Sequence, residues 1–260
     1  MGFARVIHPT AIVHPSARLG RHAEIGPYCI VGEHVSIGDR AVLQAHVVVN
    51  GWTEIGQECQ LYPFATIGAA SQDRKYSGER AFTRIGNRTV LREYVSIQRA
   101  TGHDEVTAVG DDCLLLAYVH IAHNCVLGNG VTMSNLAQLA GHVEVGDFAT
   151  IGGQAGVHQF TRIGRYAMIG GATKLTKDVP PFFLIEGNPA KPYGLNSVGL
   201  RRAAFTPAER NEIKRFYKIL YDPKLNVSRA IETMREEATT DPGREIVAFL
   251  ESPSQRGVLK

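Results

Sequence analysis

The sequence predicts a parallel β-helix followed by a small α-helical region at the C-terminus. Three observations lead to this prediction. Aliphatic residues recur every six positions through most of the first 175 residues. Two polar segments interrupt that period, and after residue 180 the period gives way to helical spacing. A fixed repeat of this kind is typical of solenoid architectures, in which each repeat packs on its neighbours.

The six-residue period excludes an α-helix, because six residues at 3.6 per turn would scatter the apolar positions around the helix. A triangular prism can use the period, since each hexapeptide supplies one short strand and one corner. Three hexapeptides close a coil of about eighteen residues, and coils stack at the strand spacing of about 4.8 Å. The inward-facing positions are Ile7, Val13, Leu19, Ile25, Val31, Ile37, Leu43, Val49, Ile55, Leu61, Ile67, Ile85, Leu91, Ile97, Val109, Leu115, Ile121, Leu127, Met133, Leu139, Val145, Ile151, Val157, Ile163, Ile169 and Leu175.

Glycine often follows the repeated aliphatic residue, as in Leu19-Gly20 and Ile37-Gly38. We expect these glycines to form corners where a side chain would be awkward. The two polar segments, residues 68–84 and 98–108, are expected to be loops ejected from the prism. Loops on a rigid scaffold often hold functional residues, so both are candidates for the site.

The β-helix is expected to span residues 1–180, with a helical region over 181–260. Pro180-Pro181 marks this boundary. Thr206-Pro207-Ala208-Glu209 is a capping box with proline at the first helical position. Two further helices are expected to begin near Asn226 or Ser228 and near Asp241-Pro242.

Composition restricts the class of protein. Charged residues make up 20% of the chain and the net charge is +3, without the basic stripe of a duplex nucleic-acid binder. We find no signal peptide and no apolar run long enough for an integral membrane segment. The four cysteines form no CxxC pair, which favours reduced thiols and a cytoplasmic protein.

A row of histidines is predicted along one edge of the prism. Ile121, Leu139 and Val157 are eighteen residues apart, so they stack in successive coils. Histidines follow each of them within three positions, and we expect their side chains to be about 5 Å apart along the edge. The residues predicted to gather there are His120, His123, Gly141, His142 and His158.

Two chemistries suit such a row. His120, His123 and Cys125 are zinc ligand types, and some carbonic anhydrases bind zinc through histidines on this kind of prism. Alternatively, one histidine acts as a general base on a hydroxyl nucleophile. Asp73 and Lys75, from the first polar segment, are suited to a sugar substrate and favour the second chemistry, in which no metal takes part.

These motifs resemble the UDP-N-acetylglucosamine acyltransferase family of lipid A synthesis. The resemblance covers essentially the whole chain and implies a left-handed β-helix and a homotrimer. It also implies transfer of a (3R)-hydroxyacyl group from acyl carrier protein to the 3-hydroxyl of UDP-GlcNAc. The donor carries its own phosphopantetheine, so no other cofactor is implied. The resemblance rests on His8-Pro9-Thr10-Ala11-Ile12-Val13, Ser71-Gln72-Asp73-Arg74-Lys75-Tyr76, His120-Ile121-Ala122-His123, Leu139-Ala140-Gly141-His142, His158-Gln159-Phe160, Asp178-Val179-Pro180-Pro181, Gly187-Asn188-Pro189 and Gly194-Leu195-Asn196.

The resemblance also implies a role for each site residue. His123 is the implied general base and Gly141 the implied oxyanion donor. Gly171 is implied to leave room for a longer acyl chain in a groove between coils. The residues implied to bind substrate are Asp73, Lys75, His120, His142, His158, Gln159, Asn196 and Arg202, the last two near the nucleotide.

Three positions depart from the family pattern and leave alternatives open. Asn124 stands where the family often has aspartate, Gln98 replaces a histidine, and Val198 replaces an acidic residue. A UDP diamino-sugar acceptor is therefore one alternative. A related N-acyltransferase and a non-catalytic carrier-protein-binding module are two others. Basic residues of the C-terminal region suit docking of acidic acyl carrier protein: Arg201, Arg202, Arg210, Lys214, Arg215 and Lys218.

Overall fold

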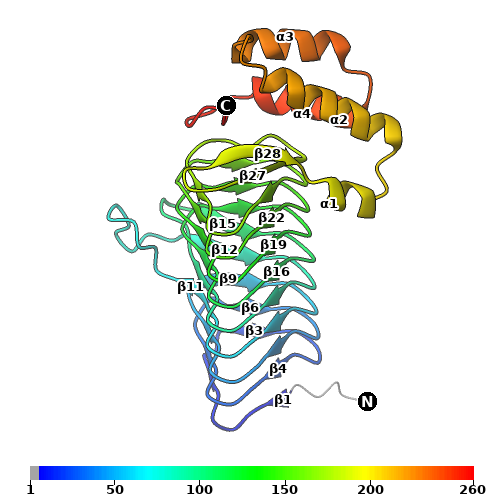
Figure 1. The fold of residues 1–260 in the computed structure, drawn as a ribbon. Helices are drawn as coiled ribbons and strands as arrows, with labels where there is room; N and C mark the ends of the chain where they lie inside the picture. The colour runs from blue at the N-terminus through cyan, green and yellow to red at the C-terminus, as the bar shows by residue number, and fades with distance from the viewer. Residues whose placement is uncertain (1–5) are drawn as a thin grey trace.

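The computed structural model describes residues 6–260, whose strands form the three faces of a triangular prism (Figure 1). Within the prism, each strand pairs in parallel with the equivalent strand of the next coil. In the regular coils that partner is eighteen residues away, as for Ile121↔Leu139 and Leu139↔Val157. Among the described residues, no helix is long and apolar enough to cross a membrane.

Each face of the prism is one sheet. The first sheet contains β1 (Val6–Ile7), β4 (Glu24–Ile25), β7 (Val42–Leu43), β10 (Gln60–Leu61), β13 (Val90–Leu91), β16 (Leu114–Leu115), β19 (Thr132–Met133), β22 (Thr150–Ile151), β25 (Met168–Ile169), β27 (Phe183–Glu186) and β28 (Lys191–Leu195). The second contains β2 (Ile12–Val13), β5 (Ile30–Val31), β8 (Val48–Val49), β11 (Thr66–Ala69), β14 (Ser96–Gln98), β17 (His120–Ile121), β20 (Gln138–Leu139), β23 (Gly156–Val157) and β26 (Lys174–Leu175). The third contains β3 (Arg18–Leu19), β6 (Ser36–Ile37), β9 (Trp52–Ile55), β12 (Phe82–Ile85), β15 (Val106–Val109), β18 (Val126–Leu127), β21 (Glu144–Val145) and β24 (Arg162–Ile163).

The predicted aliphatic register forms the core. Ile25, Leu61 and Leu139 are fully or almost fully buried, whereas Ile7, in the first coil that the structure describes, is 44% exposed. A second inward position, four residues after each aliphatic, was missed because small residues fill it. All four cysteines occupy this second position, where they are buried and free: Cys29, Cys59, Cys113 and Cys125.

Glycines such as Gly20 and Gly38, which follow the repeated aliphatic residue, form crowded corners, as predicted, but they do not adopt the left-handed conformation. That conformation belongs to the third residue after the aliphatic, which is seldom glycine; Tyr28 and Arg40, for example, have φ of 58° and 55°. Glycine at position 20 is explained by the lack of space for a side chain. A Cβ atom there would lie 2.5 Å from the backbone nitrogen of Asp39 in the next coil, so the close approach of coils excludes any side chain.

The two ejected loops are shorter than predicted, and the strands continue further. β11 extends through Ala69 and β12 begins at Phe82, because Phe82–Ile85 pairs along its whole length with β9. The excursions are therefore residues 70–81 and 99–105. Strands also continue past residue 180. β27 pairs in parallel with β25, and β28 folds back against β27 in antiparallel register.

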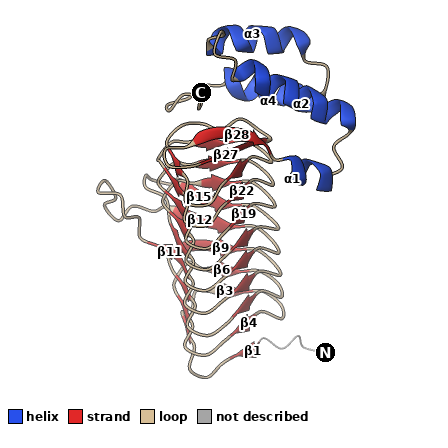
Figure 2. Ribbon diagram, viewed as in Figure 1, coloured by secondary structure: helices blue, strands red, loops and turns tan. Residues whose placement is uncertain are grey.

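Helices cover the C-terminal end of the prism (Figure 2). They are α1 (Ser197–Arg202), α2 (Pro207–Leu220), α3 (Val227–Glu237) and α4 (Asp241–Glu251), of which α1 was not predicted. The capping box at Thr206 and the N-cap at Asn226 are confirmed. α4 begins at Asp241, as predicted, and Thr240 is its N-cap.

Candidate active site

The edge between the second and third sheets holds the predicted histidines and both ejected loops. Its successive corners are residues 122–125, 140–143 and 158–161, which we call the histidine edge. The excursions 70–81 and 99–105 leave the same edge in the two coils below, and the first projects from the prism after β11 (Figure 1). The coil period thus brings both loops and the histidines together.

The rings on this edge lie in contact. His123 and His142 meet edge to face with centroids 5.2 Å apart, and His142 stacks on Phe160 at 4.6 Å. His158 and Gln159 are exposed in the next corner, where His158 Nδ1 lies 3.2 Å from the Gln159 carbonyl oxygen and donates to it. The predicted row of histidines is therefore present, with two of its rings packed together.

The proton on His123 is placed by its neighbours. Asn124 Oδ1 accepts the Thr101 N–H at 2.9 Å, while Asn124 Nδ2 donates to the Thr101 carbonyl at 3.1 Å. These two backbone groups fix the amide orientation, because one can only donate and the other only accept. His123 Nδ1 lies 2.9 Å from Asn124 Oδ1 and must donate to it. His123 Nε2 therefore keeps its lone pair, as a general base requires.

Asp73 faces the free nitrogen of that ring. Its Oδ2 lies 3.9 Å from His123 Nε2, too far for a hydrogen bond, and both side chains are largely buried, 23% and 15% exposed. The Ser71 hydroxyl accepts the Asp73 N–H, and Asp73 Oδ1 accepts the Lys75 N–H. Lys75 itself is exposed on the same turn. The loop thus holds a carboxylate beside the His123 imidazole, at a distance too long for a hydrogen bond.

Gly141 is required by the position of His123. A Cβ atom on Gly141 would lie 2.4 Å from His123 Cε1 and 2.5 Å from Nε2. Within residues 6–260, moreover, neither the backbone N–H of Gly141 nor the backbone N–H of His123 has a hydrogen-bond acceptor. The edge therefore offers unpaired backbone donors next to an imidazole base, as stabilisation of an oxyanion requires.

Burial favours the neutral form of two neighbouring imidazoles. Burial lowers the pKa of His120, whose Nδ1 lies 2.7 Å from the Ser96 hydroxyl. The pKa of His142 is lowered first by burial and then by the neighbouring His123 imidazole. Neutral rings donate and accept hydrogen bonds together, which suits contact with sugar hydroxyls.

A hollow of about 430 Å³ extends from the histidine edge across the second sheet. Its floor is open at Gly156, where a Cβ atom would meet nothing within 4 Å. Apolar atoms dominate its lining, which suits a hydrocarbon chain. The lining includes His120, Gln138, Gly156, His158 and Lys174.

Three predicted residues lie away from the histidine edge. Gly171 forms a corner between the first and second sheets. Asn196 is buried as the N-cap of α1, where its amide accepts from Gly199 and donates to the Tyr166 carbonyl. Arg202 is exposed in the last turn of α1, which lies across the prism from the projecting loop (Figure 1). One chain alone does not bring these three residues to His123.

The ligand set considered for zinc is not assembled. Cys125 points inward and its Sγ lies 3.1 Å from the Ala140 carbonyl oxygen, while burial raises the pKa of the thiol to about 12. It therefore stays protonated and faces away from His120 and His123. Residues 6–260 contain no group of three His, Cys, Asp or Glu side chains arranged to hold a metal ion.

Sequence reasoning missed the residues that support the site. Thr101 and Ser96 act through a backbone and a hydroxyl group, which no motif reveals. Gln98 is buried, and its Oε1 accepts the Gln72 N–H, so it anchors the first loop. Gln98 and Asn124, two departures from the family pattern, are both structural partners of the loops.

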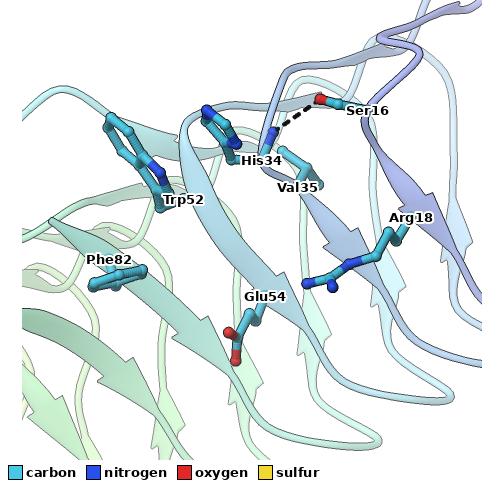
Figure 3. A pocket seen from close by; sticks show the side chains of 7 residues that line it. All are labelled: Ser16, Arg18, His34, Val35, Trp52, Glu54 and Phe82. Carbon is cyan, nitrogen blue, oxygen red and sulfur yellow. Dashed lines mark hydrogen bonds between the residues drawn. The ribbon is translucent and has the colours of Figure 1, made fainter. Parts of the chain in front are cut away.

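A separate hollow of about 330 Å³ lies lower on the same edge (Figure 3). There His34 stacks on Trp52 with centroids 5.2 Å apart, and the Ser16 hydroxyl accepts the His34 N–H. Arg18 and Glu54 project from the adjoining face of the third sheet (Figure 3). Stacked rings of successive coils therefore line the edge here, whereas two coils above it send out loops.

Comparison with known proteins identifies the family. The chain is 50% identical over 218 residues to an acyl-[acyl-carrier-protein]–UDP-N-acetylglucosamine O-acyltransferase of Thermodesulfovibrio yellowstonii, covering 83% of this chain and 84% of the relative. It is 43% identical to the Synechocystis enzyme of the same name over 95% of this chain and 90% of the relative. The chain belongs to this acyltransferase family.

Family models and a solved structure agree with that assignment. Residues 178–259 match the second domain of UDP-N-acetylglucosamine O-acyltransferase, and residues 16–51 match the bacterial transferase hexapeptide. The crystal structure of the Francisella novicida UDP-N-acetylglucosamine acyltransferase superposes with a TM-score of 0.95 at 36% identity, covering 98% of this chain and 94% of that one. The left-handed parallel β-helix with C-terminal helices, expected for this acyltransferase family, is confirmed.

Proposed function

We propose that the chain transfers a (3R)-hydroxyacyl group from acyl carrier protein to the glucosamine 3-hydroxyl of UDP-GlcNAc, the first step of lipid A synthesis. One observation of the site supports this above all. Asn124 holds His123 Nδ1 as a donor, so Nε2 faces the Asp73 side with its lone pair free. The names of the relatives favour UDP-GlcNAc over a diamino sugar as the acceptor.

The reaction we propose needs no acyl-enzyme. His123 Nε2 takes the proton of the sugar hydroxyl as its oxygen attacks the thioester carbon. The Gly141 N–H, unpaired within residues 6–260, stabilises the oxyanion of the tetrahedral intermediate. Collapse of that intermediate breaks the carbon–sulfur bond. The departing thiolate of the phosphopantetheine arm then takes the proton from His123, leaving an ester and a free thiol.

We also propose that the active protein is a homotrimer. Asn196 and Arg202 are expected near the nucleotide and Gly171 along the acyl chain, yet all three lie away from the chain's own histidine edge. A neighbouring prism packed against that edge could supply them. Basic side chains of α2, including Arg210 and Lys214, suit docking of an acidic carrier protein.

The remaining features fit a reaction without a resident cofactor. The donor brings the phosphopantetheine arm, and the base and oxyanion donor proposed above are groups of the chain itself. A cytoplasmic location is proposed because the four cysteines, all described, are free and buried, as in a reducing compartment.

The test replaces the proposed base. His123→Ala should lower kcat/KM by about 10²–10⁴-fold, because general-base catalysis contributes about that much. Product would be followed by mass spectrometry with hydroxyacyl carrier proteins of several lengths, and oligomeric state by light scattering. Near-normal turnover by a correctly assembled variant would refute the assigned base.

A further inference from the structure

One carboxylate joins the two ejected loops. Glu79 lies in the first loop, and its Oε1 accepts the Gly102 N–H of the second loop at 2.8 Å. Its Oε2 accepts the Ser77 N–H at 2.8 Å and the Ser77 hydroxyl at 3.1 Å. These bonds lower the pKa of Glu79 to about 2, the Gly102 bond most of all, so Glu79 is ionised at any pH used for assay.

The bond to Gly102 lies next to the group that orients the catalytic histidine. Thr101 precedes Gly102, and its N–H and carbonyl together fix the amide of Asn124. That amide in turn receives the proton of His123 Nδ1. A continuous path of hydrogen bonds and one peptide unit therefore leads from Glu79 to His123.

We propose that Glu79 is a positioning residue for the reaction, acting through Thr101 and Asn124 to hold His123 in the tautomer with a free Nε2. This rests on the proposed role of His123 as base. Without Glu79 the Gly102 N–H loses its acceptor, so the Thr101–Gly102 peptide unit is held less firmly, although the Ser71–Thr101 and Arg80–Asp104 contacts still join the two loops. The Asn124 amide can then rotate and present Nδ2 to the imidazole. His123 Nδ1 becomes an acceptor, Nε2 carries the proton, and the ring cannot deprotonate an alcohol.

The first measurement is steady-state kinetics. Glu79→Ala should lower kcat by about tenfold, a size typical when a partner of a functional side chain is removed. Glu79→Gln should give a smaller loss, because its amide keeps one acceptor for Gly102 but faces Ser77 with a donor. Glu58→Gln is the matched control, since Glu58 pairs with Arg40 on another edge, and its kcat should stay within about twofold of the parent.

A double-mutant cycle separates positioning from general damage to the fold. In Asn124→Asp the side chain accepts at both oxygens, so it receives the His123 Nδ1 proton whichever way it is turned. Glu79→Ala should then cost less than about twofold in kcat in that background, against about tenfold in the parent. Equal losses in both backgrounds would overturn the proposal.

The tautomer can also be observed directly by ¹⁵N spectra of the imidazoles, with the His123 signals assigned by their loss in His123→Ala. The parent should show Nδ1 protonated and Nε2 unprotonated, and Glu79→Ala should show a mixture. A folded Glu79→Ala protein with the parent tautomer would overturn the proposal. This outcome differs from failure of the proposed function, which would appear as turnover by His123→Ala.

Discussion

Two edges of this prism follow the same backbone path at their corners but use their backbone N–H groups differently. On the edge between the third and first sheets, side chains of the second corner residue bind the coil before them; we call it the Asx edge. Its acceptors are Asp39, Asn87, Asp111, Asn129 and Asp147. Each takes the N–H of the equivalent residue one coil earlier, as Asn129 Oδ1 accepts the Asp111 N–H at 2.8 Å.

The histidine edge leaves the corresponding groups unpaired. His123 occupies the second corner position, and in the next coil that position is Gly141, which has no side chain to accept the His123 N–H. The Gly141 N–H likewise has no acceptor among the described residues. Stability and function thus compete for the same backbone donors. One edge uses them between coils, and the other leaves them unpaired, where the proposed mechanism uses the Gly141 N–H.

The largest effect is expected when one methyl group is added to the histidine edge, which tests whether this edge is specialised for activity. Gly141→Ala should lower kcat/KM by about a hundredfold, because the new Cβ would lie 2.4 Å from His123 Cε1 and the ring must shift. Steady-state kinetics would measure this loss, with thermal unfolding as the check on folding. Gly32→Ala, lower on the same edge with only ordinary contacts, should retain activity. Full activity in Gly141→Ala would mean that the ring position is unimportant.

A complementary change removes a ladder contact from the Asx edge. Asn129→Ala takes away the acceptor of the Asp111 N–H and should lower the free energy of unfolding by about 1 kcal/mol. Activity should stay within about twofold, since this edge holds none of the site residues. Urea unfolding and steady-state kinetics would measure the two effects. If turnover fell while stability held, the division of roles between the edges would be wrong.

The sequence predicted the stacking of coils well because the period is a property of spacing alone. Ile121, Leu139 and Val157 lie in paired strands as expected, and the contact between His123 and His142 follows from them. The stacking of Phe160 on His142 was not predicted. Loop bounds were less accurate, because Thr83 and Arg84 are polar yet pair with β9. Helix α1 was missed because six residues give too short a pattern to recognise.

The inner contacts of the site were beyond sequence reasoning. Nothing in the pattern indicates that Thr101 orients Asn124, because the contact depends on the path of the second loop. Nor could spacing show that Glu79 reaches Gly102 or that Gln98 binds Gln72. Such bonds join residues more than twenty positions apart through segments that leave the repeat. The eighteen-residue period does not predict where the residues of those segments lie.

The smallest expected effect is on the pH dependence of stability. A substitution beside the histidine edge should change this dependence, whereas one on the Asx edge should not. Burial lowers the pKa of His120 below its ordinary value of 6.5, so the unfolded chain binds more protons than the folded one below about pH 6.5. Stability should therefore fall as pH drops from 7 through the folded pKa.

His120→Gln should flatten that slope, because glutamine does not titrate, while Asn129→Ala should keep it. His142 contributes in the same direction, so part of the slope should remain in His120→Gln. Thermal unfolding from pH 7 to 5 would measure the difference, and an unchanged slope in His120→Gln would show that burial of this imidazole does not oppose its protonation.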